Sequence, residues 1–317
     1  MKKMQQEKQG QLNKISLIGR GGIGLPMFFC LYIAQSIDAL AILMHGGRDK
    51  SMVNSMQSMG SFGGALVGSG LLLVVLHTFG WQTVTLCLGL FVLLMLIPLI
   101  MRREPVIAAK STQERARLTD FASFFTQRGI WRQIGFLMLY YASMIGILSM
   151  MRPWLVDLGY DMKEIGVMSG IVGTSAAFCA SFGAGLLLRR VGIRFTRILF
   201  ACFILFTTIY FLGLSYLSQP STLLLYLGII LMWSSYGMAT IVVYTSAMEC
   251  VRPGREGTDF TIQTVLTHLS GIIIATLSGS VAQHFGYHGL FLTESFIAAL
   301  SLCYILVFFR NKACSQN

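Results

Sequence analysis

The sequence predicts an all-α polytopic membrane protein with nine transmembrane helices, and three observations lead to this fold class. Hydrophobic residues make up 55% of the chain and charged residues only 12%, which is about half the roughly 25% typical of soluble proteins. The apolar residues form long runs, each close to the roughly 20 residues that a helix needs to cross a bilayer. The basic residues gather in short clusters between these runs, as is typical of membrane proteins.

Nine runs are long and apolar enough to span a membrane. In order, they are residues 23–44, 53–77, 82–101, 133–151, 165–188, 195–217, 221–247, 260–284 and 289–309. Backbone groups in lipid must form their hydrogen bonds within their own segment, so each run is predicted to be a helix. The second and third runs are so close that residues 78–81 must form a tight turn, and the last two runs require another at residues 285–289.

Lysine and arginine are distributed unevenly between alternate loops. One set of loops carries Arg48 and Lys50, seven cations in residues 102–132, then Arg189, Arg190, Arg194 and Arg197, then Arg252 and Arg255, and finally Arg310 and Lys312. The intervening loops carry only Arg152 and Lys163. The positive-inside rule therefore predicts that the first set and the C-terminus lie in the cytoplasm. This distribution also accounts for the net charge of +11 without a nucleic-acid partner, because no basic stripe is interleaved with aromatic residues.

An internal repeat relates two parts of the chain. Residues 48–81 and 254–287 each join a basic loop, a helix with an early glutamine, and a Phe-Gly-aromatic turn. Gln57 and Gln263 are 206 positions apart, and so are Gly80 and Gly286. Chance similarity between two membrane helices is the alternative explanation. With six helices per repeat, we expect three further helices before residue 20, which also explains why residues 1–20 are basic although nine spans would leave them outside.

The loop between the fifth and sixth runs carries a motif. Gly185, Arg190, Gly192 and Arg194 fit the pattern G-x-x-x-D-R-x-G-R-R, with Arg189 in place of the aspartate. This resembles the signature loop of the major facilitator superfamily, found between its second and third helices and again between its eighth and ninth. The resemblance implies that the nine helices correspond to helices four to twelve of a twelve-helix fold.

The same resemblance implies a division of the chain. Residues 1–20 would be a polar tail of uncertain origin, residues 21–101 the three remaining helices of an N-terminal bundle, and residues 102–132 the central cytoplasmic loop. Residues 133–309 would form the C-terminal six-helix bundle, and residues 310–317 a cytoplasmic tail. An inactive, truncated remnant of a transporter is an alternative.

Two further stretches narrow the branch of the superfamily. Residues 48–70 and 151–173 resemble bacterial importers of siderophores and, less closely, the muropeptide and acetyl-coenzyme A permeases. The resemblance implies a monomeric symporter in the bacterial inner membrane, which imports a bulky polar solute, with a ferric siderophore as the first candidate, together with protons. It implies no cofactor and no metal site. A membrane acyltransferase is the alternative from another class, but it would need a histidine–aspartate or metal cluster, and the five histidines form none.

Polar groups inside apolar runs are the candidate site residues, because each is energetically expensive in lipid. Asp38 is the foremost candidate for substrate and proton binding, and the repeat relates it to Tyr244. The other substrate candidates are Gln57, Gln263, Tyr140, Tyr141 and Trp233, the last with Tyr236 beside it, and packing or helix bridging is the alternative role for each. His268 is a proton-relay candidate. Glu294, in the last helix, is interpreted as a structural residue.

Overall fold

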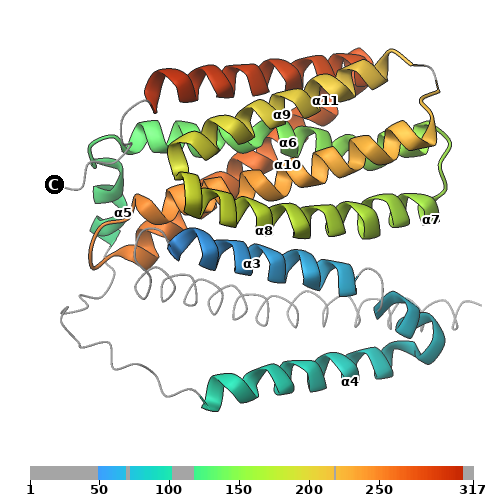
Figure 1. Cartoon of the computed structure of the whole chain (residues 1–317), viewed down its shortest axis with the longest axis horizontal. Helices are drawn as coiled ribbons and strands as arrows, with labels where there is room; N and C mark the ends of the chain where they lie inside the picture. The colour runs from blue at the N-terminus through green and yellow to red at the C-terminus, as the bar shows by residue number, and fades with distance from the viewer. Residues whose placement is uncertain (1–48, 69–71, 102–117, 218, 310–317) are drawn as a thin grey trace, which may run out of the picture.

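The computed structural model describes residues 49–68, 72–101, 118–217 and 219–309, and all regular secondary structure in these ranges is helical. In chain order the helices are α3 (Asp49–Leu66), α4 (Leu72–Met101), α5 (Leu118–Phe125), α6 (Ile130–Asp157), α7 (Met162–Ile165), the π-helix η2 (Gly166–Gly173), α8 (Thr174–Val191), α9 (Ile193–Ser215), α10 (Thr222–Glu249) and α11 (Glu256–Phe308) (Figure 1). Within the described ranges, five helices are long and apolar enough to cross a membrane. The predicted fold class, an all-α polytopic membrane protein, is confirmed.

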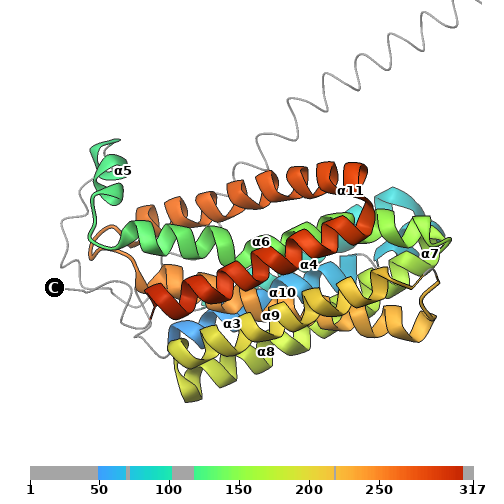
Figure 2. The ribbon, with the colours of Figure 1, turned by 90° about the horizontal axis from the view of Figure 1, so that it is seen from above.

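The six predicted runs after residue 132 all appear as helices. The run at 165–188 is one continuous span, Met162–Val191, built from α7, η2 and α8. The last two runs are the two segments of α11, which turns at Gly286. Figure 2 shows these two segments side by side. Of the three earlier runs, the first lies outside the described residues. The second covers most of α3 and the beginning of α4, and the third is the part of α4 that follows Gly80.

Gly80 and Gly286 share an uncommon backbone conformation. Gly80 in α4 has φ 77° and ψ 178°, and Gly286 in α11 has φ 68° and ψ −178°. This region of backbone space is essentially restricted to glycine. The two positions are 206 residues apart, so the turn that ends each copy of the predicted repeat is built in the same way.

We therefore expect Gly286→Ala to destabilise the protein by about 1–3 kcal/mol, because alanine is strained in this conformation. No atom of the part of the chain that the structure describes lies within 4 Å of the position that a Cβ would take at Gly286, so the effect comes from the backbone. Thermal unfolding of the purified protein in detergent measures it. Gly271→Ala is the matched control, since its added Cβ would meet Ile145 at an ordinary 3.8 Å. Equal melting temperatures for the two variants would contradict this explanation.

The helices bury one face against each other and turn an equally apolar face outward. On α9, Phe200, Ile204 and Phe211 are buried in a core shared with α6, α10 and α11. On the same helix, Phe206 and Ile209 are more than half exposed. In water this outer surface would be unfavourable, whereas in a bilayer the hydrocarbon chains cover it.

The predicted central loop, residues 102–132, contains a short helix. Phe124 of α5 is completely buried and packs with Ile130, Ile134 and Ile262. Phe121 on the same helix is 54% exposed. The described part of this segment is therefore attached to the bundle through α6 and α11 rather than extended away from it.

Candidate functional site

Helix α3 is joined to α8 and α10 by hydrogen bonds from its polar side chains. The Asn54 amide donates to the Ile241 carbonyl at 3.1 Å and to Thr245 Oγ1 at 3.3 Å, both on α10. Ser55 Oγ donates to the Ser181 carbonyl of α8 at 2.7 Å. We call this interface of α3 with α8 and α10 the bundle contact. Two of the three hydrogen-bond acceptors named here are backbone carbonyls, which water can replace as partners when the helices separate.

Glycines bring these helices close together. A Cβ at Gly185 of α8 would overlap the Ser55 side chain of α3, and one at Gly237 of α10 would lie 2.8 Å from the Ala177 carbonyl oxygen of α8. Gly185 is the first residue of the signature motif. Because it has no side chain, this residue of the motif allows α3 to approach α8 closely at the bundle contact. The close approach is the small-residue packing typical of membrane helices.

Aromatic rings gather beside the bundle contact. The ring of Tyr236 on α10 lies 5.2 Å from Tyr141 of α6, 5.8 Å from Phe62 of α3 and 5.9 Å from Trp233, measured between centroids. The Tyr141 hydroxyl is 3.2 Å from Thr240 Oγ1. We call Phe62, Tyr141, Trp233 and Tyr236 the aromatic cluster. It links three helices, so two of the predicted site residues, Tyr141 and Trp233, lie together.

Trp233 carries a donor that no group in the described ranges accepts. Its indole Nε1 is buried and has no hydrogen-bond partner among the described residues. The ring lies against Gly173 of η2, where any Cβ would overlap it. Because buried polar groups are nearly always hydrogen-bonded, an unused indole N–H is an unusual feature of this cluster. It can donate to a bound ligand.

Tyr140 lies away from this cluster, although it is adjacent to Tyr141 in the sequence. It is buried, and its hydroxyl donates to the Arg197 carbonyl at 3.1 Å. The Arg197 guanidinium lies 4.7 Å and 4.5 Å from the ring centroids of Phe136 and Phe309. Tyr140 thus packs around the buried Arg197, which lies near the N-terminal end of α9, shortly after the signature motif.

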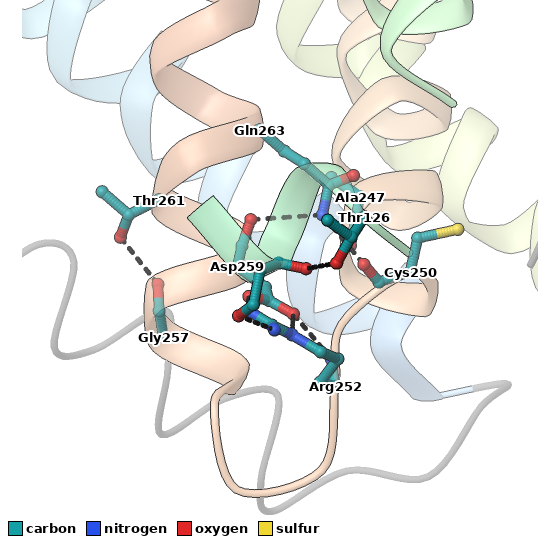
Figure 3. A network of polar contacts seen from close by, with 9 residues as sticks. Thr126, Ala247, Cys250, Arg252, Gly257, Asp259, Thr261 and Gln263 are labelled. Atoms are coloured by element: carbon teal, nitrogen blue, oxygen red, sulfur yellow. Dashed lines mark hydrogen bonds and ion pairs between the residues drawn. The ribbon is translucent and has the colours of Figure 1, made fainter. Parts of the chain in front are cut away.

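The two glutamines related by the repeat have different surroundings. Gln263 is completely buried, and its amide nitrogen lies 3.1 Å from each of the carbonyl oxygens of Ala247 and Cys250 (Figure 3). Its amide oxygen accepts a hydrogen bond from the buried Gln133 of α6. In this arrangement Gln263 joins α6, α10 and α11. Gln57 is exposed on α3.

An ion pair that the sequence did not reveal lies beside Gln263 (Figure 3). Asp259 is completely buried, and its two oxygens accept from Arg252 Nη2 at 2.6 Å and from Arg252 Nε at 2.8 Å. Arg252 Nη1 also donates to Ser123 Oγ of α5 at 2.6 Å. The hydrogen bond with Asp259 raises the pKa of Arg252 above its ordinary value, so the arginine stays charged over the whole physiological range. The sequence feature that could have indicated this ion pair is the spacing of seven residues between Arg252 and Asp259 across a basic loop.

The remaining candidates are placed as follows. Arg190 and Arg194 are exposed, and Gly192 between them turns the chain from α8 into α9 with φ 90°, which favours glycine. The Tyr244 hydroxyl is 3.4 Å from His268 Nε2. Asp38 lies outside the described residues. The roles predicted for these residues stay predictions.

A family model described as Major Facilitator Superfamily matches residues 24–275. The chain belongs to the Major Facilitator Superfamily. The resemblance drawn from the motif at residues 185–194 is thereby confirmed at the level of the superfamily. Members of this superfamily are membrane transporters of small molecules and generally not enzymes.

One relative is "Putative transporter AmpG 1" of Rickettsia prowazekii (strain Madrid E). It is 25% identical over 172 residues, which are 54% of this chain and 38% of the relative. The chain thus matches well under half the length of that protein. The match supports a transporter and does not support the siderophore branch in particular.

Proposed function

We propose that this chain acts in secondary active transport of a bulky polar solute across the bacterial inner membrane, coupled to protons. Residues 21–101 are assigned to the N-terminal bundle, residues 133–309 to the C-terminal bundle, and residues 102–132 to the cytoplasmic loop between them, with the C-terminus in the cytoplasm. The observation that carries this proposal is the aromatic cluster with its unused donor, lying where α3 meets α10.

The bundle contact and the aromatic cluster are mechanically connected under this proposal. Alternating access requires the two bundles to rock against each other around the binding site. Phe62 of α3 belongs to the first bundle and touches Tyr236 of the second. Separation of α3 from α10 therefore breaks the bundle contact and opens the aromatic cluster in the same movement.

The aromatic cluster suits a solute that has flat or ring-shaped faces and hydrogen-bond acceptors. Rings in edge-to-face and tilted arrangements present both faces and edges to a ligand, and the Trp233 N–H supplies a donor. Catecholate siderophores and the sugar rings of muropeptides both have this character. The Rickettsia relative favours the muropeptide branch among those that the sequence resembles, so a muropeptide is our first candidate and a ferric siderophore the second.

The test is uptake by the purified protein in liposomes with an imposed proton gradient. Radiolabelled disaccharide muropeptide and a ferric catecholate siderophore are supplied in parallel. We expect the muropeptide to accumulate and a protonophore to abolish the accumulation. Siderophore uptake alone would select the second candidate, and uptake of neither solute would contradict both.

Trp233→Phe should raise KM for the transported solute by roughly 2- to 10-fold, because one hydrogen bond contributes about 0.5–1.5 kcal/mol. The melting temperature should change little, since no described residue accepts a hydrogen bond from the Trp233 N–H. Initial uptake rates over a range of solute concentrations measure the effect. Trp131→Phe, at a tryptophan that is 66% exposed, is the matched control. Identical KM values in the two variants would remove Trp233 from the binding site.

Asp38→Asn should abolish proton-driven accumulation while the protein remains in the membrane. The substitution keeps the shape of the side chain and removes its ability to bind and release a proton. Uptake is measured against external pH in the wild-type and variant proteins, and membrane insertion by immunoblot. A variant that keeps the wild-type pH dependence would assign Asp38 a structural role.

A further inference from the structure

Glu294 is a buried carboxyl group in the second segment of α11. It is 1% exposed. Ser278, from the first segment of α11, donates from its hydroxyl to Glu294 Oε1 at 2.6 Å. On the other side, the carboxyl group lies against Gly146 of α6, where any Cβ would overlap it. Three helical segments thus enclose this one group.

Glu294 differs from Asp259, the other buried carboxyl in the described residues. Asp259 accepts hydrogen bonds from Arg252, which neutralises its charge. Among the described residues, Glu294 has no ion-pair partner, and its buried Oε2 atom has no hydrogen-bond partner. Ionised, it would be an isolated charge inside a membrane span, which is energetically unfavourable. The neutral acid avoids this unfavourable term.

No charged group approaches Glu294 along the segments that enclose it. On α6, the ionisable residues nearest to Gly146 in sequence are Tyr141, which pairs with Thr240, and Arg152, which is exposed. On α11, they are His284, next to the carbonyl of Ser280, and His288, next to Ser215. Tyr141 and Arg152 are five and six residues from Gly146, and each histidine is six residues from Ser278 or Glu294. Tyr141 and the two histidines also have other partners.

We propose that Glu294 is a proton-binding site, a carboxylic acid that holds its proton while α6 and the two segments of α11 are packed together. Ser278 is a suitable partner for both protonation states, because a hydroxyl donates to a carboxylate and accepts from an acid. Separation of α6 from α11 would admit water and allow the proton to leave. Only the place of this exchange in a transport cycle rests on the proposed function.

Infrared spectroscopy of the purified protein in lipid nanodiscs tests the site without a transport assay. A protonated carboxyl gives a C=O stretching band that is distinct from those of carboxylates and amides. We expect such a band at neutral pH in the wild-type protein, a lower band intensity in Glu294→Gln, and an unchanged intensity in Glu164→Gln, the control at an exposed acid. A wild-type protein without the band, or a Glu294→Gln variant that keeps its full intensity, would overturn the proposal.

A second variant covers the case in which Glu294→Gln does not fold. Ser278→Ala keeps the carboxyl and removes its one hydrogen-bond donor among the described residues. The band should then remain and move to higher frequency, as carbonyl bands do when a hydrogen bond is lost. An unmoved band would show that it arises from another group. Because neither measurement uses a solute, failure of the uptake experiments leaves this result intact.

Discussion

Replacing Arg252 with alanine should destabilise the protein by about 3–5 kcal/mol, among the largest effects expected for a substitution in this chain. Removing one partner of a buried ion pair leaves an uncompensated buried charge. This lowers the stability of the folded state more than replacing both partners does. Asp259 is completely buried and would lose the side-chain donors that neutralise it. The hydrogen bond from Arg252 to Ser123 of α5 would be lost as well. Thermal or denaturant unfolding of the purified protein measures the change.

The double variant Arg252→Ala/Asp259→Ala is the informative control. It removes both charges, so it should be more stable than Arg252→Ala alone, although it lacks every contact of the pair. Arg190→Ala, at an exposed arginine, should change the unfolding free energy by less than about 0.5 kcal/mol. A double variant as unstable as Arg252→Ala would mean that packing around these side chains, rather than charge, decides the stability.

The long helices could be predicted from the sequence because lipid imposes a simple rule. Every span needs about 20 apolar residues with internally bonded backbone, so the runs after residue 132 mark α6 to α11 to within a few residues. The repeat predicted that positions 80 and 286 correspond, and both are glycines with positive φ. Such turns are visible in sequence because few residues other than glycine adopt them.

Side-chain environments were less predictable than helices. The repeat treated Gln57 and Gln263 as equivalent, yet Gln263 is enclosed by carbonyls of α10 and by Gln133 of α6, whereas Gln57 is exposed. Tyr140 and Tyr141 were both predicted as substrate candidates, yet one faces Arg197 and the other Thr240. Successive helical residues point about 100° apart, so neighbours in sequence meet different helices, and the sequence does not specify which.

Features outside the apolar runs were missed for a related reason. Asp259 lies at the start of α11, just before the run at 260–284, and Arg252 was assigned only to membrane topology. Their pairing depends on how the loop between α10 and α11 folds. Likewise, α5 has only eight residues, which is too short for a span, and its buried Phe124 is recognisable only once Ile262 of α11 is seen beside it.

Gly185→Leu should separate α3 from α8 and shift the protein toward the state in which the bundle contact is open. Even a Cβ at this position would overlap the Ser55 side chain, so the helices must move apart and lose the hydrogen bond from Ser55 to Ser181. Overpacking of this kind is unfavourable by about 1–3 kcal/mol, which corresponds to a change of roughly 5- to 150-fold in the ratio of the two states. To measure the separation, spin labels are attached through non-canonical amino acids at position 56 on α3 and position 182 on α8. The distance between the two labels reports how far α3 lies from α8.

Gly183→Leu provides the matched control, because it lies two residues away on the same helix and no atom of the described residues lies within 4 Å of an added Cβ. It should leave the distance distribution unchanged, so any effect of leucine on helix propensity or hydrophobicity is common to both variants. If the proposed function is correct, Gly185→Leu also lowers the uptake rate, since a contact that cannot close keeps the solute site open to one side. A Gly185→Leu protein with wild-type distances would show that α3 adjusts without moving from α8, and the bundle contact could not then be the gate.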